Sequence, residues 1–366
     1  MKIICFARST YIIISLLVTC AGCSTHAQEL YKFQTVKVSE GIYQLVSSEV
    51  NGDWVTGNTT VIINEKDVMI VDAGFLPSVA RQAIAEIKKL TNKPVKYLVN
   101  THWHGDHWQG NSAFKEAYPD VRIIASEEAL RGMQTKGMFW LKKNYIKLFE
   151  DNIAQREKVL ATGIDTKGKK ISDEEKEKIK RQVSFNNAEV EEIRHIQPLF
   201  PDLTFTKELL IRSGSREIQL HYFGWGNTTG DAVIYLPQEK ILITGDLVVS
   251  PSPYESGSFS TEWLNVFKKL KEFSFTTLLP GHGTVEHDSN YLDFLIALFE
   301  EIIREVNPPV LEGKTLEETQ KIVTHQTVTQ ALSKRPVLTP FIKDLDPHFV
   351  EAALLRAYPK AKEGKL

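Results

Sequence analysis

The apolar positions of this chain follow two periods, which predict strands and helices in separate stretches. Apolar and polar residues alternate over Gly41–Val46 and again over Thr59–Ile63, as expected for strands of a hairpin with one buried face. The wholly apolar run Val68–Val71 predicts a buried strand. From Ser78 to Leu90 the apolar residues recur at helical spacing, which predicts an amphipathic helix with Ser78, after Pro77, as its N-cap. The first quarter of the chain is therefore mixed α and β.

The same periods predict mixed structure through the middle of the chain and helices at its end. Further strands are expected at 94–100, 121–125, 203–205, 209–211, 217–223, 232–235, 241–244 and 277–279. Further helices are expected after Gly110, from Ser126, over 261–273, and in the tail over 291–306, 316–333 and 347–357. Pro308, Pro336 and Pro340 interrupt the tail. Periodicity by itself predicts a mixed fold and does not select an architecture.

One charged stretch, Lys136–His195, differs from its surroundings. Its charges are of mixed sign at helical spacing, with a break at Gly163–Gly168 and a restart at the capping box Ser172–Glu175. A solvated two-helix insertion is one interpretation. The other is a lid, because the apolar residues Met133, Met138, Phe139 and Trp140 could face a site.

The first residues predict an export signal. Lys2 and Arg8 precede the apolar run Tyr11–Val18, which is too short for a permanent membrane span. Cleavage after Ala27 would release the chain, whereas cleavage before Cys23 would leave a lipidated cysteine, and both interpretations are open. We therefore expect a signal peptide over residues 1–27 and a periplasmic or secreted protein, with membrane contact only through lipidation at Cys23.

Composition narrows the classes of partner and of site. Lys and Arg number 44 against 46 for Asp and Glu, so charge gives no reason to expect a nucleic acid or an anionic membrane as partner. The 366 residues suffice for one large domain or for two. The three cysteines, Cys5, Cys20 and Cys23, all lie in the signal segment. The chain after that segment can therefore form no disulfide framework, and no cysteine there can bind a metal.

Candidate chemistry is concentrated in Thr101–Gly110, which reads THWHGDHWQG. Three histidines and an aspartate fall within six positions, from His102 to His107. Neutral imidazoles are good ligands for zinc or iron, and a carboxylate adds the negative charge that a dication requires. The cluster follows the carboxyl end of a predicted buried strand, where open α/β sheets place their sites. This composition favours a metal-binding loop over a surface loop that happens to contain histidine.

The pattern His-x-His-x-Asp-His resembles the metallo-β-lactamase superfamily, and four further motifs support the resemblance. They are VMIVDAG at 68–74, GWGNTTGD at 224–231, ITGDL at 243–247 and LPGHG at 279–283, in the family's order. The resemblance covers about Tyr31 to Thr284. It implies an α+β fold, a four-layer αββα sandwich, over residues 28–284, with a helical insertion at about 136–195. Residues 285–366 then form a helical C-terminal extension.

The resemblance also implies a site for zinc, with one or two ions per chain. The implied ligands are His102, His104 and Asn227 for one ion, Asp106, His107 and His282 for the other, and Asp246 bridging both. Asp72 would hold the ligand loop by hydrogen bonds, and a plain turn aspartate is the alternative. A bridged pair lowers the pKa of its shared water and so generates hydroxide, with Asp106 as the catalytic residue that orients it or shuttles the proton.

The chain departs from the family pattern at Asn227, where a third histidine is expected. An amide oxygen is a poorer zinc ligand than imidazole. One interpretation is a dinuclear site with two unequal ions. Another is that only the site of Asp106, His107, His282 and Asp246 fills at ordinary metal levels. In a third, Asn227 caps its own turn and binds no metal.

The expected function is that of an exported zinc-dependent hydrolase that cleaves an amide, ester or lactone bond in a small molecule, with β-lactamase-like activity within that range. Trp54, Trp103, Trp225 and Tyr254 suggest an aromatic mouth, unsuited to a multiply charged phosphate, although they could equally pack for stability. Two alternatives remain: a mononuclear iron sulfur dioxygenase of the same superfamily, and a non-catalytic metal-binding module.

Overall fold

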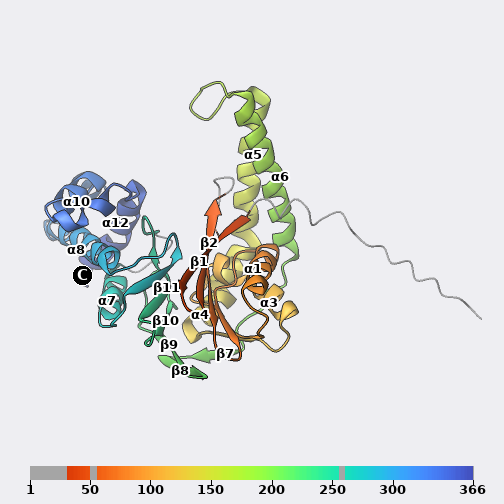
Figure 1. Ribbon diagram of the computed structural model, residues 1–366. Coiled ribbons are helices and arrows are strands. Elements are labelled where there is room, and N and C mark those ends of the chain that lie inside the picture. Colours follow the sequence, from red (N-terminus) through yellow and green to blue (C-terminus); the bar gives the residue numbers. More distant parts are fainter. Residues whose placement is uncertain (1–30, 50–55, 255–259, 366) are drawn as a thin grey trace, which may run out of the picture.

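Two β-sheets form the centre of the computed structural model, which describes residues 31–49, 56–254 and 260–365 (Figure 1). In order across the first sheet lie β1 (Tyr31–Ser39), β2 (Ile42–Glu49), β3 (Thr59–Ile63), β4 (Val68–Val71), β5 (Val95–Val99), β6 (Arg122–Ser126) and β7 (Leu203–Phe205). Across the second lie β12 (Thr277–His282), β11 (Ile241–Val249), β10 (Ala232–Leu236), β9 (Arg216–Tyr222) and β8 (Glu208–Ser213). The signal segment and Trp54 lie outside the described residues.

Strand direction determines which loops meet at the site. Strands β1 to β4 pair antiparallel, and β4 to β7 pair parallel. The second sheet is antiparallel except for the pair β11–β12. Parallel neighbours present their carboxyl ends at one edge, so the loops after β4, β5, β11 and β12 can converge there.

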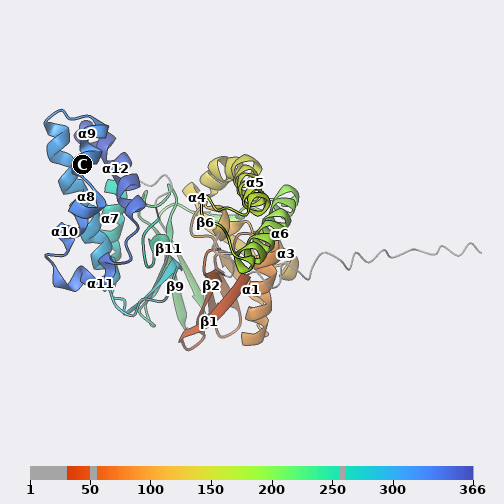
Figure 2. The ribbon, with the colours of Figure 1, turned by 90° about the horizontal axis from the view of Figure 1, so that it is seen from above.

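Helices cover the outer face of each sheet (Figure 2). On the first sheet lie α1 (Pro77–Leu90), α3 (Asn111–Ala117) and α4 (Glu127–Gly132), with the short α2 (Gly105–Trp108) at its edge. On the second lie α7 (Ser260–Leu270) and α8 (Asn290–Leu311). Helices α10 (His325–Leu332) and α12 (Pro347–Lys362) pack against α8, accompanied by α9 (Leu316–Ile322) and α11 (Thr339–Ile342). None of the helices in the described ranges is both long enough and apolar enough to cross a bilayer.

The alternation of side chains along β10 shows how the layers are packed. Ala232, Ile234 and Leu236 point into the core between the two sheets, where they meet residues of β2 to β6. Val233 and Tyr235, the intervening residues, point outward and pack against the helices. Both faces of the second sheet are therefore buried, and the predicted four-layer αββα sandwich of the α+β class is confirmed.

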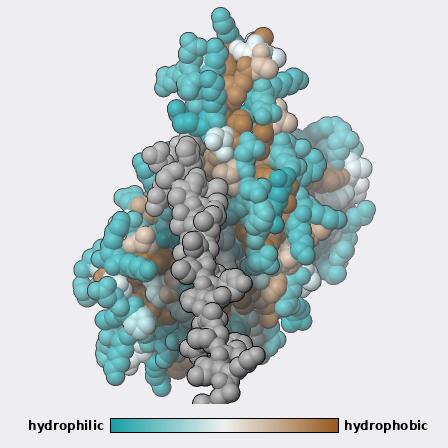
Figure 3. Space-filling view, turned by 90° about the vertical axis from the view of Figure 1, so that its right-hand side faces the viewer, coloured by the Kyte–Doolittle hydropathy of each residue, from teal (hydrophilic) through white to brown (hydrophobic). Residues whose placement is uncertain are grey.

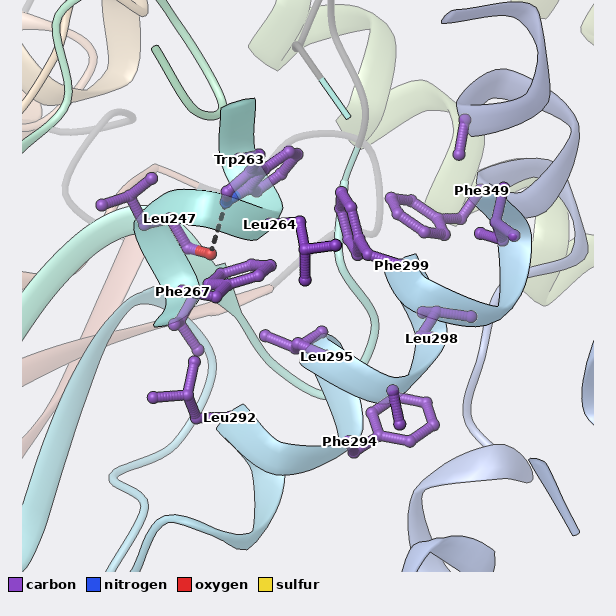
Figure 4. Packing of buried hydrophobic residues seen from close by; sticks show 14 of the residues in the cluster. Leu247, Trp263, Leu264, Phe267, Leu292, Phe294, Leu295, Leu298, Phe299 and Phe349 are labelled. Atoms are coloured by element: carbon purple, nitrogen blue, oxygen red, sulfur yellow. Dashed lines mark hydrogen bonds between the residues drawn. The ribbon is translucent and has the colours of Figure 1, made fainter. Parts of the chain in front are cut away.

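The C-terminal helices share one apolar core with the second sheet (Figure 4). Trp263 and Phe267 of α7 pack against Phe299 of α8, with ring centroids 5.1 and 5.3 Å from it. Phe349 of α12 packs on the other side of Phe299, at 5.7 Å. The indole N–H of Trp263 also donates to the carbonyl of Leu247 in β11, at 3.2 Å. This core attaches the extension to the strand that carries Asp246.

The charged stretch forms a helical hairpin that projects away from the two sheets (Figure 1). Two π-helical turns, Met133–Gly137 and Trp140–Asn144, lead into α5 (Tyr145–Thr162), and α6 (Asp173–His195) returns. The break at Gly163 and the capping box at Ser172 are confirmed. On the face drawn in Figure 3, a stripe of apolar side chains runs along this hairpin between hydrophilic ones.

The base of the hairpin is buried. Leu141, Tyr145 and Phe149 pack against Phe75 and Leu76, which follow β4. Of the four residues expected on a lid face, Met133 is fully buried, and only Phe139 is markedly exposed, at 52%. The outer hairpin is solvated, whereas its base is part of the wall beside the metal loop.

Three details of the helices differ from the sequence prediction. Leu76, and not Ser78, is the N-cap of α1, because Pro77 already occupies the first helical position. The stretch 316–333 forms two helices, since Thr324 caps a new helix through Thr327. Helix α8 continues past Pro308 and Pro309 to Leu311; two prolines in the last turn remove only two backbone donors.

The cap of α1 comes from the insertion. The backbone N–H and the hydroxyl of Ser78 donate to the carboxylate of Glu192 in α6, at 2.7 and 2.6 Å. The negative charge of Glu192 thus lies at the positive end of the α1 dipole. Sequence patterns could not show this cap, because its acceptor lies 114 residues from its donor.

We predict that Glu192→Ala lowers the free energy of unfolding by about 1 kcal/mol, the usual effect of losing a helix cap. The measurement is urea unfolding followed by circular dichroism. Glu191→Ala is the matched control, because Glu191 is exposed and, in the part of the chain that the structure describes, its carboxylate pairs with Arg194 and His195 of its own helix only. Equal effects of the two substitutions would show that the contact with Ser78 does not stabilise α1.

Candidate metal centre

The metal loop follows β5 and is held from several sides. The side-chain amide of Asn100 donates to the carbonyl of His107 (3.1 Å) and to Asn111 (2.9 Å). The backbone N–H of Ala73, after β4, also donates to the carbonyl of His107, at 2.8 Å. Within the loop, the rings of His102 and His104 lie with centroids 4.7 Å apart. The two imidazoles therefore face a common space, as an extended loop permits and a helix would not.

Six of the seven ligands expected from the sequence form two groups that could each hold a metal ion. The first group is His102, His104 and Asp246, and the second group is Asp106, His107 and His282; within each, one ligand atom per residue lies within 4.8 Å of the others.

Asp246 connects the two groups. Its Oδ2 lies 3.5 Å from Nε2 of His102, and its Oδ1 lies 3.2 Å from Nε2 of His107. Its Oδ1 is also 3.5 Å from Nε2 of His282. The carboxylate thus turns one oxygen toward each group, the arrangement that a bridging ligand requires.

The unpaired atoms of the site fit a metal ion. Nε2 of His102, His104 and His107, and Oδ1 of Asp246, are buried and make no hydrogen bond in the described parts of the chain. A buried polar atom without a partner costs about 1–3 kcal/mol. Four such atoms around one space are explained together if a cation binds there, since each offers it a lone pair.

Burial sets the protonation of the first group. It lowers the pKa of His104 to about 4 and that of His102 well below its ordinary value. Both imidazoles are therefore neutral near pH 7, as metal ligands must be. For Asp246, burial opposes ionisation, but His107 and His282 outweigh it and lower the pKa.

In the second group, a proton on the imidazoles can take the place of the positive charge that a bound cation would supply to the carboxylates. Burial opposes charge on His107 and His282, but Asp246 and Asp106 outweigh it and raise the pKa of both histidines. The pKa of Asp106 is lowered, because His107 and His282 outweigh its burial. Asp106 lies 3.0 Å from Nε2 of His282 and 3.3 Å from Nε2 of His107. The carboxylates of Asp106 and Asp246 thus stabilise positive charge between the residues of the second group.

Asp72 holds the ligand loop by hydrogen bonds, as the family resemblance implied. It contacts His107 directly and His102 through Thr101. Its Oδ2 pairs with Nδ1 of His107 at 2.8 Å, and its two oxygens accept the backbone N–H and the hydroxyl of Thr101, each at 2.8 Å. Since the hydroxyl of Thr101 donates to Asp72, it accepts from Nδ1 of His102, 3.0 Å away. Both imidazoles then carry their proton on Nδ1 and keep Nε2 free for a metal.

Asn227 lies in the turn between β9 and β10 and is 1% exposed. Asp231 accepts the backbone N–H of Thr228 (2.7 Å), and the hydroxyl of Thr228 accepts that of Gly230 (3.1 Å). Neither amide atom of Asn227 has a hydrogen-bond partner among the described residues. The turn is therefore capped by other side chains. The backbone N–H of Ala232 joins this loop to the carbonyl of Thr101 at 2.8 Å, one residue before His102.

Two residues that the sequence prediction missed also border the site. Tyr145 of the insertion is buried against the metal loop, and a Cβ added to Gly105 would lie 2.9 Å from its hydroxyl. Burial raises the pKa of Tyr145, so the phenol is neutral. Asn58, just before β3, is bonded to the loop of His282. Neither belongs to a metal-ligand motif, so no sequence pattern singled them out.

The aromatic residues expected at the mouth divide into two kinds. Trp103 is 6% exposed, and a Cβ on Gly132 would lie 2.3 Å from its ring, so it packs inside the wall. Trp225 and Tyr254 are exposed, at 44% and 59%. Of the expected mouth residues that the structure describes, Trp225 and Tyr254 can offer an apolar surface to a small molecule.

Comparison with known proteins places this geometry in a family. The sequence-family model of the metallo-beta-lactamase superfamily matches residues 52–282 of this chain. A linear primary-alkylsulfatase of Pseudomonas sp. (strain ATCC 19151) is 25% identical over 230 residues, 59% of this chain and 39% of that protein. A metallo-beta-lactamase type 2 of Bacillus sp. (strain 170) is 23% identical over 241 residues, 64% of this chain and 70% of that protein.

A similar solved structure is that of a stereoselective inverting sec-alkylsulfatase from Pseudomonas sp. It has a TM-score of 0.60 and 15% identity, and the match covers 90% of this chain and 50% of that one. The chain thus spans at most half the length of the two alkylsulfatases that it matches. The family match over more than half of the chain, with the sandwich and its paired histidine–aspartate groups, shows that this protein belongs to the metallo-β-lactamase superfamily.

Proposed function

We propose that this protein is a zinc-dependent hydrolase that cleaves an amide, ester or lactone bond in a small molecule. The observation that carries the proposal is the carboxylate of Asp246, which turns one oxygen to each of two His/Asp groups with unpaired ligand atoms. Metal ions bound there would supply Lewis acidity and an activated water at neutral pH. Zinc is proposed because imidazole and carboxylate groups are common zinc ligands. Catalytic zinc sites built from them keep one coordination position open for water or substrate.

The protein's own residues keep the site ready for this chemistry. Asp72 and Thr101 orient His102 and His107 with Nε2 toward the site. Asp106 is the catalytic residue that we propose, because its carboxylate lies inside the second group, 3.0 Å from Nε2 of His282 and 3.3 Å from Nε2 of His107. Its lowered pKa makes it a weak base. We therefore assign to it the orientation of the attacking water by hydrogen bonding.

The substrate is proposed to be neutral or weakly charged around the reacting bond. Trp225 and Tyr254 provide the exposed apolar surface. Lactams fall within this class, in keeping with the β-lactamases among the relatives. Export to the periplasm or beyond, with or without lipidation at Cys23, is part of the same proposal and is supported by the N-terminal signal pattern.

A sulfate ester is the second candidate substrate, and the C-terminal extension favours it. The match to the sec-alkylsulfatase structure leaves 10% of this chain uncovered, about 37 of 366 residues, whereas 82 residues follow Thr284. The similarity therefore reaches into the helical extension. A long alkyl sulfate would need an apolar surface beside the metal centre, which Trp225 and Tyr254 could also offer.

We predict that the purified protein binds one or two zinc ions per chain and that chelation abolishes its hydrolytic activity. Metal content is measured by mass spectrometry, and activity with a panel of β-lactams, lactones, esters, thioesters, phosphodiesters and alkyl sulfates. Iron as the sole metal, with oxidation of persulfides, would favour the sulfur dioxygenase. Bound zinc without any turnover across the panel would favour the non-catalytic module.

We predict that Asp106→Asn lowers kcat by about a hundredfold or more, since it removes a charged group that orients the nucleophile. His282→Ala should lower activity similarly by weakening the second group. Substitutions of exposed residues in 136–195 should cost less, because the outer hairpin is solvated and holds none of the candidate ligands. Glu174→Ala, on the exposed face of α6, is the control. Equal losses from the insertion would make it part of the catalytic apparatus.

We predict that Asn227→His tightens zinc binding at the first group by about ten- to hundredfold, the scale seen when ligand shells change. The buried amide atoms of Asn227 have no partner in the described structure, so an imidazole there would add a ligand without breaking a bond. Zinc titration of the apo-protein should show two unequal affinities that draw closer in the variant. An unchanged weaker affinity with a lowered melting temperature would refute the ligand assignment.

A further inference from the structure

The segment before β3 contacts both loops that carry the second group. A Cβ added to Gly57 would lie 2.5 Å from Cε1 of His107, so the glycine backbone packs directly on that imidazole. The next residue, Asn58, is 4% exposed and is bonded to the residues on either side of His282. Its backbone N–H donates to the carbonyl of Gly281, at 2.7 Å.

The side chain of Asn58 bonds three further backbone groups. Its Nδ2 donates to the carbonyls of Pro280 (3.2 Å) and Gly283 (2.9 Å), and its Oδ1 accepts the N–H of Ser47 in β2 (3.1 Å). Gln44 also donates to Pro280, at 3.0 Å, so that carbonyl has a second partner. The carbonyl of Gly283, the residue after His282, accepts its side-chain hydrogen bond from the amide of Asn58.

These hydrogen bonds of Asn58 join the two sheets at the second group, whose ligands come from both sheets. His107 follows β5 of the first sheet, whereas His282 is the last residue of β12 in the second. Asp72 holds Nδ1 of His107, but within the described ranges no side chain holds Nδ1 of His282 in that way. The position of His282 therefore depends on its backbone, which is held by Asn58 on one side and by the N–H of Ser250 on the other.

We propose that Asn58 is a positioning residue for metal binding, which holds His282 in reach of the ion shared with Asp106 and His107. The inference rests on the proposed metal centre and not on the identity of the substrate. Loss of the amide would free the carbonyl of Gly283 and let the loop move relative to the first sheet. The second group would then lose affinity, while His102, His104 and Asp246 would keep theirs.

Asn64 provides a matched control, because it lies at the other end of the same strand. Its amide is also buried, at 3% exposure; its Nδ2 donates to Asp67 (2.7 Å), and its Oδ1 accepts from Arg216 (3.2 Å). Both asparagines thus join β3 to neighbouring groups, but only Asn58 contacts the loop of His282. Asn58→Ala and Asn64→Ala should therefore cost comparable stability and differ in metal binding.

The test is zinc titration of the full apo-protein against a chromophoric chelator, with His282→Ala and His102→Ala marking which affinity belongs to which group. We expect Asn58→Ala to weaken the affinity that His282→Ala abolishes by about tenfold or more, and to leave the other unchanged. Asn64→Ala should change neither. Asn58→Ser, which keeps one short donor, should lie between the natural protein and Asn58→Ala.

Three outcomes would overturn the proposal: equal weakening of both affinities by Asn58→Ala, no weakening, or the same weakening by Asn64→Ala. Circular dichroism checks that each variant is folded, and Asn58→Ser keeps the test open if Asn58→Ala is not. Because the readout is affinity, its failure is distinct from that of the proposed function. Natural protein that binds zinc with two affinities and hydrolyses nothing would refute only the hydrolase.

Discussion

The carboxylate of Asp72 is the interaction on which the metal centre depends. It accepts the Nδ1 proton of His107 and the hydroxyl of Thr101, which in turn accepts from His102. One buried anion thereby selects the tautomer of an imidazole in each group. Asp72 itself sits at φ 65°, a left-handed conformation that a non-glycine residue adopts at a cost. Its hydrogen bonds with Thr101 and His107 hold the carboxylate in place, so that the Nε2 atoms of His102 and His107 face the candidate metal centre.

Charge balance explains why this edge of the sandwich is built around polar side chains. Asp72, Asp106 and Asp246 are all buried, and buried carboxylates are costly unless positive charge or hydrogen bonds compensate them. For Asp72, burial raises the pKa, and the charge of His107 and the hydrogen bonds from His107 and Thr101 oppose that rise in part. The other two are compensated by His107 and His282, whose pKa values they raise. A divalent cation could take over that compensation, which makes metal binding and the stability of this edge two aspects of one arrangement.

Neither sheet contains a complete group of candidate ligands. The first sheet contributes the loop of His102 to His107, and the second contributes Asp246 and His282. The apolar core between the sheets sets the distance between them. Asn58 bonds the loop of His282 in the second sheet to the start of β3 in the first. The C-terminal helices stabilise β11 from outside, through Trp263 and Leu247. Parts of the chain far from the chemistry therefore determine whether the two groups assemble.

The sequence by itself determined what depends on neighbouring residues. The strands, most helices and the capping box at Ser172 follow from local periods and local hydrogen bonds. The density of ligands in His102–His107 predicts a metal loop without any tertiary information. Tertiary structure decided what depends on distant partners. Glu192 and not Ser78 caps α1, Tyr145 borders the metal loop, and Asn58 holds the loop of His282, more than 220 residues away. The physical reason is that a side-chain hydrogen bond between distant segments leaves no periodic trace in the sequence: any residue with the right donor or acceptor can form it once the sheets have packed.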